Sequence, residues 1–164
     1  MKRAYLALIA PGLFAGLQFI QPPASAASTA PAGASRHASG SFDVNTAPAG
    51  TPDTQAGATI GRYTLDKQYH GDLAGSGKGE MLTAVSATPG SAAYVAIERV
   101  SGTLHGREGS FAVHHTGTRS AGKQQLAIAI VPDSGSGQLA GISGTMDIQI
   151  VDGKHRYSIE YRLP

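Results

Sequence analysis

The stretch that decides the fold is residues 95–117, VAIERVSGTLHGREGSFAVHHTG. Apolar and polar residues alternate along two runs, and His105-Gly106 separates the runs. Alternation with a period of two is typical of strands that bury one face, and a two-residue link ending in glycine is typical of a hairpin. The stretch therefore predicts two antiparallel strands joined by a tight turn.

The predicted hairpin places one carboxylate and one imidazole on a common face. With His105-Gly106 as the turn, the cross-strand pairs are Val100 with Phe111, Glu98 with Val113, and Ala96 with His115. Diagonal neighbours on adjacent strands lie about 7–8 Å apart, which is within reach of long side chains. We take the Phe111 face as interior, although the opposite face around Arg99 is mixed in polarity and leaves this assignment open.

The same alternation recurs along the chain, with turn-forming residues at short intervals. No stretch of helical length shows a 3.6-residue period, which favours an all-β fold. Eight strands are expected, at residues 40–45, 59–72, 77–87, 92–104, 108–118, 123–131, 141–151 and 154–163. Short links make an antiparallel meander, and closure removes its two free edges. We predict a closed eight-stranded antiparallel meander barrel over residues 40–164, with a two-sheet sandwich as the alternative.

The C-terminal hairpin gives the clearest register. Asp152-Gly153 is typical of a type I′ turn, because both positions need a positive φ that Asp and Gly tolerate. This turn pairs Ile150 with His155, Ile148 with Tyr157, and Met146 with Ile159. One face of the hairpin is then apolar on both strands, as a barrel wall requires.

The N-terminus has the pattern of an export signal. Lys2 and Arg3 precede an apolar run, and Ala24-Ser25-Ala26 follows it as a cleavage-like site. The alternative is a transmembrane anchor, but the run is short and contains Pro11. We expect a signal peptide over residues 1–26 that is cleaved near Ala26. The mature protein would be secreted or periplasmic, without stable membrane insertion. Residues 27–39 are expected to form a disordered leader, and residues 46–58 a loop.

The composition shows what can stabilise the fold and argues against one class of partner. The 164 residues suffice for one domain, and the chain contains no cysteine, so the fold depends on its core alone. Without Lys2 and Arg3, the thirteen basic residues become eleven, against eleven acidic residues. A balanced charge argues against nucleic acid as a partner, because nucleic-acid binding needs a basic face.

Glu98 and His115 are the candidate catalytic residues. A carboxylate beside an imidazole fixes its tautomer, and the pair can transfer protons or anchor a polar ligand group. The alternative is a buried pair that satisfies its own hydrogen bonds and does nothing more. Candidate ligand-binding residues are those whose alternation or aromatic character places them at the interior: Tyr63, Lys67, Tyr69, Glu80, Tyr94 and Phe111. The histidines lack ligand spacing, so we expect no metal. We also expect no cofactor.

Three strings resemble one family. They are ERVSGTLHGREGSFAVHHTGT at residues 98–118, VPDSGSGQLAGISGTMDI at 131–148 and YHGDLAGSGKGEMLTA at 69–84. They resemble the bacterial domain-of-unknown-function family 3224, whose members look like allene oxide cyclase barrels. The resemblance covers residue 40 to the C-terminus and implies a closed eight-stranded barrel, but no reaction. Asp133 and Met81 depart from the family pattern.

Three functions remain open from the sequence. The first is an exported barrel that binds a small hydrophobic molecule, with Glu98 and His115 as a polar anchor. The second is a cofactor-free isomerase or cyclase in which one of these residues moves a proton. The third is a structural or protein-binding barrel with a packed lumen. A cavity of roughly 300 Å³ or more would favour the first two. The mixed face around Arg99 also offers a surface for a homodimer.

Overall fold

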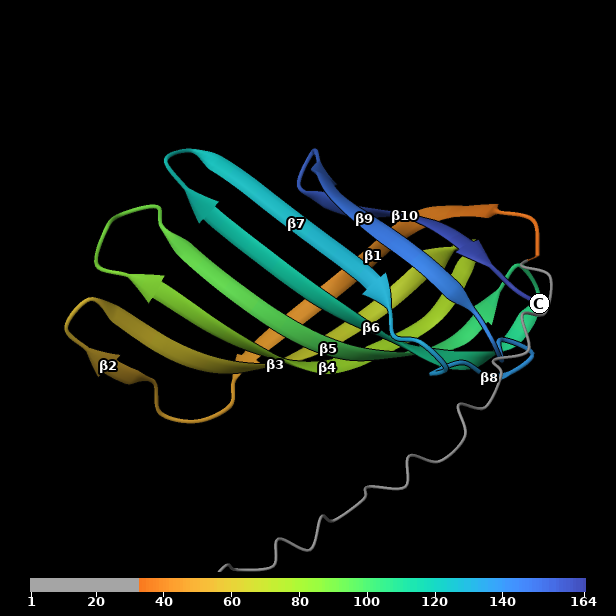
Figure 1. The fold of residues 1–164 in the computed structure, drawn as a ribbon, viewed down its shortest axis with the longest axis horizontal. Helices are drawn as coiled ribbons and strands as arrows, with labels where there is room; N and C mark the ends of the chain where they lie inside the picture. The colour runs from red at the N-terminus through yellow and green to blue at the C-terminus, as the bar shows by residue number, and fades with distance from the viewer. Residues whose placement is uncertain (1–32) are drawn as a thin grey trace, which may run out of the picture.

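The computed structural model describes residues 33–164, which form strands and turns without any helix (Figure 1). The expected signal peptide and the first part of the leader lie outside the described residues. The part of the chain that is described contains no helix long and apolar enough to cross a membrane. The strands are β1 (Arg36–Pro48), β2 (Asp53–Gln55), β3 (Ala58–Gly71), β4 (Leu73–Ser86), β5 (Ala92–Leu104), β6 (Arg107–Ser120), β7 (Lys123–Ile130), β8 (Ser136–Gly137), β9 (Ser143–Val151) and β10 (Lys154–Arg162).

Eight long antiparallel strands close into a barrel, in the order β1-β10-β9-β7-β6-β5-β4-β3 and back to β1. Strand β1 closes it by pairing with β10 through Arg36–Phe42 and with β3 through Gly40–Pro48. The two short strands are additions, with β2 pairing to β3 and β8 pairing to β6. The predicted closed meander is confirmed, and the sandwich alternative is wrong.

Both predicted hairpin registers are confirmed. Ala96 pairs with His115 and Val100 with Phe111, while Ile150 pairs with His155 and Met146 with Ile159. In both turns the two central residues have positive φ: 46° at His105, 77° at Gly106, 51° at Asp152 and 73° at Gly153. These are the conformations that a type I′ turn requires.

The N-terminal boundaries differ from the prediction. Strand β1 begins at Arg36 rather than at residue 40, and Ala38 is fully buried opposite Ile159. Residues 46–58 are not one loop, because β1 continues to Pro48 and β2 occupies Asp53–Gln55. The small and polar residues of these segments suggested disorder. The structure instead pairs their backbone with neighbouring strands, and such pairing does not require large apolar side chains.

The two ends of the barrel differ. Figure 1 shows the hairpins between β4 and β5 and between β6 and β7 projecting at one end, while β8 and the C-terminus lie at the other. Near β8 the interior is filled by buried apolar side chains, among them Leu73, Leu104, Phe111, Leu139 and Ile142. The barrel is therefore a cup with one packed end.

One tyrosine connects the two strands that flank β1, by reaching from β10 to the turn at the end of β3. The Tyr157 hydroxyl on β10 accepts a hydrogen bond from the Leu73 amide at 2.9 Å and lies 3.3 Å from the His70 carbonyl oxygen. Its ring crosses β1 at Gly40, where a Cβ atom would come within 2.6 Å of the hydroxyl oxygen. Glycine at this position lets the ring reach from β10 over β1 to the turn after β3.

Replacing Tyr157 with Phe is expected to lower the free energy of unfolding by about 1–3 kcal/mol, because the Leu73 amide loses the hydroxyl that accepts its hydrogen bond. Urea unfolding measures the change. Tyr63→Phe is the matched control, since this half-buried tyrosine makes no side-chain hydrogen bond within residues 33–164. An equal effect of the two substitutions would show that the hydroxyl does not support closure.

Candidate functional site

A buried ionic cluster lies midway along the barrel, and Glu98 of β5 is its centre. Its side chain is 0% exposed. One carboxylate oxygen, Oε2, lies 2.6 Å from the Lys67 Nζ, and the other, Oε1, accepts a hydrogen bond from the Tyr69 hydroxyl at 2.7 Å. The His115 Nε2 of β6 lies 3.3 Å from Oε2. The expected pair of Glu98 and His115 is thus brought together, and β3 adds two further members.

Glycines on the inner face of β4 make room for the cluster. Register places Gly75, Gly77 and Gly79 on this face, between β3 and β5. A Cβ atom at Gly77 would lie 1.9 Å from the Glu98 Oε1 and 2.9 Å from the Tyr69 ring. Because β4 presents no side chain there, the residues of β3 and β5 meet across it.

The cluster keeps Glu98 ionised. Burial pushes the pKa of Glu98 upward, but His115, Lys67 and Tyr69 together hold the pKa below its ordinary value. Burial and the neighbouring Glu98 charge raise the pKa of Tyr69, so this hydroxyl remains a neutral donor. Lys67 also lies over the Phe42 ring, with Nζ 4.8 Å from the ring centroid. The ammonium and the carboxylate therefore compensate each other inside the barrel.

His115 is less completely bonded than its neighbours. It is 4% exposed, and its Nε2 is buried without a hydrogen-bond partner. The 3.3 Å separation from Glu98 Oε2 is short enough for an ion pair once the imidazole carries a proton, but the geometry does not form a hydrogen bond. Buried polar atoms normally have partners, so an unpaired nitrogen here has unused bonding capacity.

Above the cluster the barrel opens into a cavity of about 670 Å³. Its polar floor includes Lys67 and His115, and its walls are mostly apolar. The remaining lining residues are Phe42, Val44, Thr46, Leu65, Met81, Tyr94, Ala96, Gln124, Leu126, Ile148, Ile150 and His155. A volume of this size falls within the usual range for small-molecule sites. The alternative of a fully packed lumen does not fit this structure.

The structure separates the predicted site residues into three groups. Lys67, Tyr94 and His115 line the cavity. Glu98 and Tyr69 lie beneath its floor and do not line it, and Phe111 belongs to the packed core. Tyr63 is half-buried and does not line the cavity.

Glu80 does not face the interior as expected. Its side chain is 59% exposed and forms an ion pair with Arg62, with contacts of 2.9 and 3.1 Å. The prediction rested on the apolar residues Leu82 and Ala84, which share its face. The interior face of β4 is instead the one with the glycines, and Leu82 is 51% exposed.

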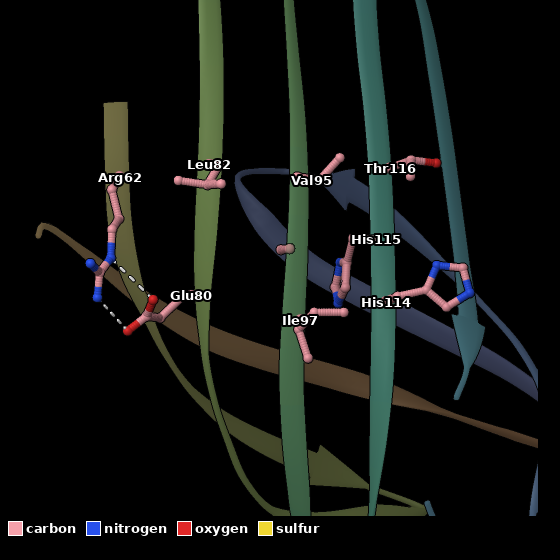
Figure 2. A pocket seen from close by; sticks show the side chains of 9 residues that line it. Arg62, Glu80, Leu82, Val95, Ile97, His114, His115 and Thr116 are labelled. Carbon is pink, nitrogen blue, oxygen red and sulfur yellow. Dashed lines mark hydrogen bonds and ion pairs between the residues drawn. The ribbon is translucent and has the colours of Figure 1, made fainter. Parts of the chain in front are cut away.

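The outer face of β4, β5 and β6 carries a second hollow of about 640 Å³ (Figure 2). Figure 2 shows the Arg62–Glu80 ion pair at one side, with Leu82, Val95 and Ile97 on the neighbouring strands. Only the barrel wall separates this hollow from the cavity, because Ala96 and His115 line both. The ionic cluster faces the inside, so the cavity is the candidate functional site.

Two contributors to the site were not anticipated from the sequence. Phe42 stacks on His155, with ring centroids 5.0 Å apart, and lies beneath the Lys67 ammonium. Gly77 provides the space for Glu98. Glycine at every second position of the segment GSGKG was the available signal for a strand face without side chains. Within residues 33–164, no group of three or more acidic or histidine side chains is arranged to hold a metal ion.

The fold and the cavity define a small closed β-barrel shaped as a cup with an ionic floor. The chain belongs to the DUF3224 family of proteins of unknown function, whose profile matches residues 38–161. It is similar to the crystal structure of a DUF3224 protein of unknown function from Shewanella oneidensis MR-1, with 42% sequence identity and a TM-score of 0.76. The match covers 80% of this chain and 99% of that one. A search of curated proteins found no significant match.

Replacing Glu98 with Gln is expected to lower the free energy of unfolding near neutral pH by about 3 kcal/mol, because Lys67 loses its counter-charge. Because folding lowers the pKa of Glu98, its ionised carboxylate stabilises the protein at pH values above 4.5, the ordinary pKa of the group. This contribution is lost as the pH falls below 4.5 and Glu98 becomes protonated. The difference between wild type and variant should therefore shrink below pH 4.5.

Urea unfolding at a series of pH values measures this difference. The double variant Lys67→Met with Glu98→Gln is the control, and it should recover part of the lost stability because no unpaired charge remains. A difference that stays constant with pH would contradict an ionised Glu98.

Replacing Gly77 with Ala is expected to destabilise the barrel by about 1–3 kcal/mol, because the new methyl group must displace the Glu98 carboxylate or the Tyr69 ring. Thermal unfolding measures the change. Lys78→Ala is the matched control, since the neighbouring side chain is 73% exposed. A neutral Gly77→Ala would show that the cluster tolerates a side chain at this position.

Proposed function

We propose that the protein is an exported β-barrel that binds a small, largely hydrophobic molecule in the open end of the barrel. The observation that supports this most directly is the cavity of about 670 Å³, with apolar walls and a polar floor. Ligand sites typically combine a mostly apolar lining with a few placed polar groups. Lys67 and His115 would contact the ligand, while Glu98 and Tyr69 hold these groups from beneath. The export part of the proposal rests on the signal-like N-terminal sequence.

A cofactor-free isomerase or cyclase is the second candidate, and the unpartnered Nε2 of His115 favours it. Glu98 is poorly suited to move a substrate proton, because its pKa is held low and it does not line the cavity. Proton transfer would therefore fall to His115. Binding needs fewer assumptions, since it uses the cavity and its floor without a reaction.

Blocking the cavity tests the proposal. Met81→Trp should weaken binding of the neutral apolar dye N-phenyl-1-naphthylamine by about tenfold or more, because Met81 lines the cavity wall. Leu82→Trp is the matched control, since the adjacent side chain faces outward and should leave binding unchanged. The chain has no tryptophan of its own, so energy transfer from the new indole to the dye also reports where the dye lies.

Three results would count against the proposal: no dye binding to the wild type, an equal loss in both variants, or a loss confined to Leu82→Trp. A second, independent experiment is native mass spectrometry of the protein purified from its own host, which detects a small molecule that stays bound. A retained small molecule that competes with the dye supports the proposal, and one that does not compete contradicts it.

A further inference from the structure

The charges that line the cavity have one sign. Lys67 is the charged side chain of the lining, and the imidazoles of His115 and His155 are its other basic groups. Among the residues that the structure describes, no Asp or Glu lines this cavity. Glu98 is within the cluster, but it is fully buried beneath the floor. A ligand that reaches the floor therefore meets nitrogen donors rather than carboxylate acceptors.

Both floor groups have bonding capacity left. An ammonium has three donors, and the contacts of Lys67 at 2.6 Å to Glu98 and 3.4 Å to Tyr69 use two of them. His115 has a buried Nε2 without a hydrogen bond. The two Glu98 oxygens, by contrast, already accept from Tyr69 and Lys67. Lys67 thus has a donor left for a ligand and His115 has an unpaired ring nitrogen, whereas the acceptors of Glu98 are occupied.

We infer that the ligand is an amphipathic monocarboxylate whose head group binds at Lys67 and His115 and whose binding places a proton on His115. This inference rests on the proposed function and specifies its ligand. The Lys67 charge is already compensated by Glu98, so an added carboxylate needs a second positive charge. His115 is the titratable side chain of the floor that can supply it. A dianionic head group would leave one negative charge uncompensated.

The groups around His115 determine how binding depends on pH. Glu98 of β5 and Lys67 of β3 are its charged neighbours, Tyr69 of β3 lies within the cluster, and Tyr94 of β5 and His155 of β10 share its cavity. Protonated His115 would lie between two carboxylates, those of Glu98 and the ligand. Affinity for the carboxylate should therefore be higher at lower pH, where a proton for the imidazole is more readily available.

The test compares decanoate, decanol and decylamine by isothermal titration calorimetry on the wild-type protein. Decanoate should bind about tenfold or more tightly than decanol, because the head group gains charge-assisted hydrogen bonds. Decylamine should bind more weakly than decanol. Titrations in phosphate and in Tris should reveal proton uptake with decanoate and none with decanol, since the apparent enthalpy changes with the buffer only when protons are exchanged.

Two variants locate the effect. His115→Gln should abolish the proton uptake and bring decanoate to within a few-fold of decanol. His114→Gln is the matched control, because this neighbour lines the outer hollow and not the cavity, and it should change neither quantity. The order of the three affinities and the number of protons taken up on binding are both measured on the wild type. They therefore decide the outcome even if His115→Gln does not fold.

The possible failures are distinguishable. Equal affinities for decanoate and decanol, a preference for decylamine, or decanoate binding without proton uptake would overturn the head-group inference and leave the apolar cavity function intact. A His114→Gln variant that loses proton uptake would overturn it as well. If none of the three probes binds, both the inference and the proposed function are wrong.

Discussion

Everything in this structure depends on the double pairing of β1, which hydrogen-bonds to β10 and to β3. An open meander of eight strands would leave two edges with unpaired backbone groups, and closure removes both. With no cysteine in the chain, no disulfide supports the closure. Backbone pairing, the Tyr157 hydroxyl and the small Gly40 support it instead. The cavity exists because this closed wall surrounds it.

The polar layer divides the barrel interior into two parts with different roles. Towards β8 the lumen is packed with apolar side chains, which provide most of the hydrophobic stabilisation. Beyond the layer the walls remain apolar, but the space is open. Burying Glu98 or Lys67 alone would carry a large desolvation free energy, and the ion pair between them offsets part of it. The packed end can therefore stabilise the fold while the open end remains available to a ligand.

Alternation and turn chemistry were enough to predict the eight long strands, both hairpin registers and the interior position of Glu98 and His115, but not the short β2 and β8. They were not enough for β4, where apolar Leu82 lies outside and glycines occupy the inside, so Glu80 was placed on the wrong face. Nor did they show that Lys67 and Tyr69 join Glu98, because that contact depends on a neighbouring strand without side chains. The start of β1 was missed since Ala38 looks like leader sequence, and its burial follows from pairing with a strand more than a hundred residues away.

That distant pairing has a consequence for how the chain acquires its shape. The contacts of β1 with β3 join nearby segments, whereas Ala38 meets Ile159 only after nearly the whole sequence is available. Contacts between residues far apart in the sequence lose the most entropy when the intervening loop closes, and this loss slows folding. During synthesis, β3, β4 and β5 can assemble around Glu98 while the last strands are still in the ribosome. The wall would then be completed late, by the arrival of β10 beside a strand that was made first.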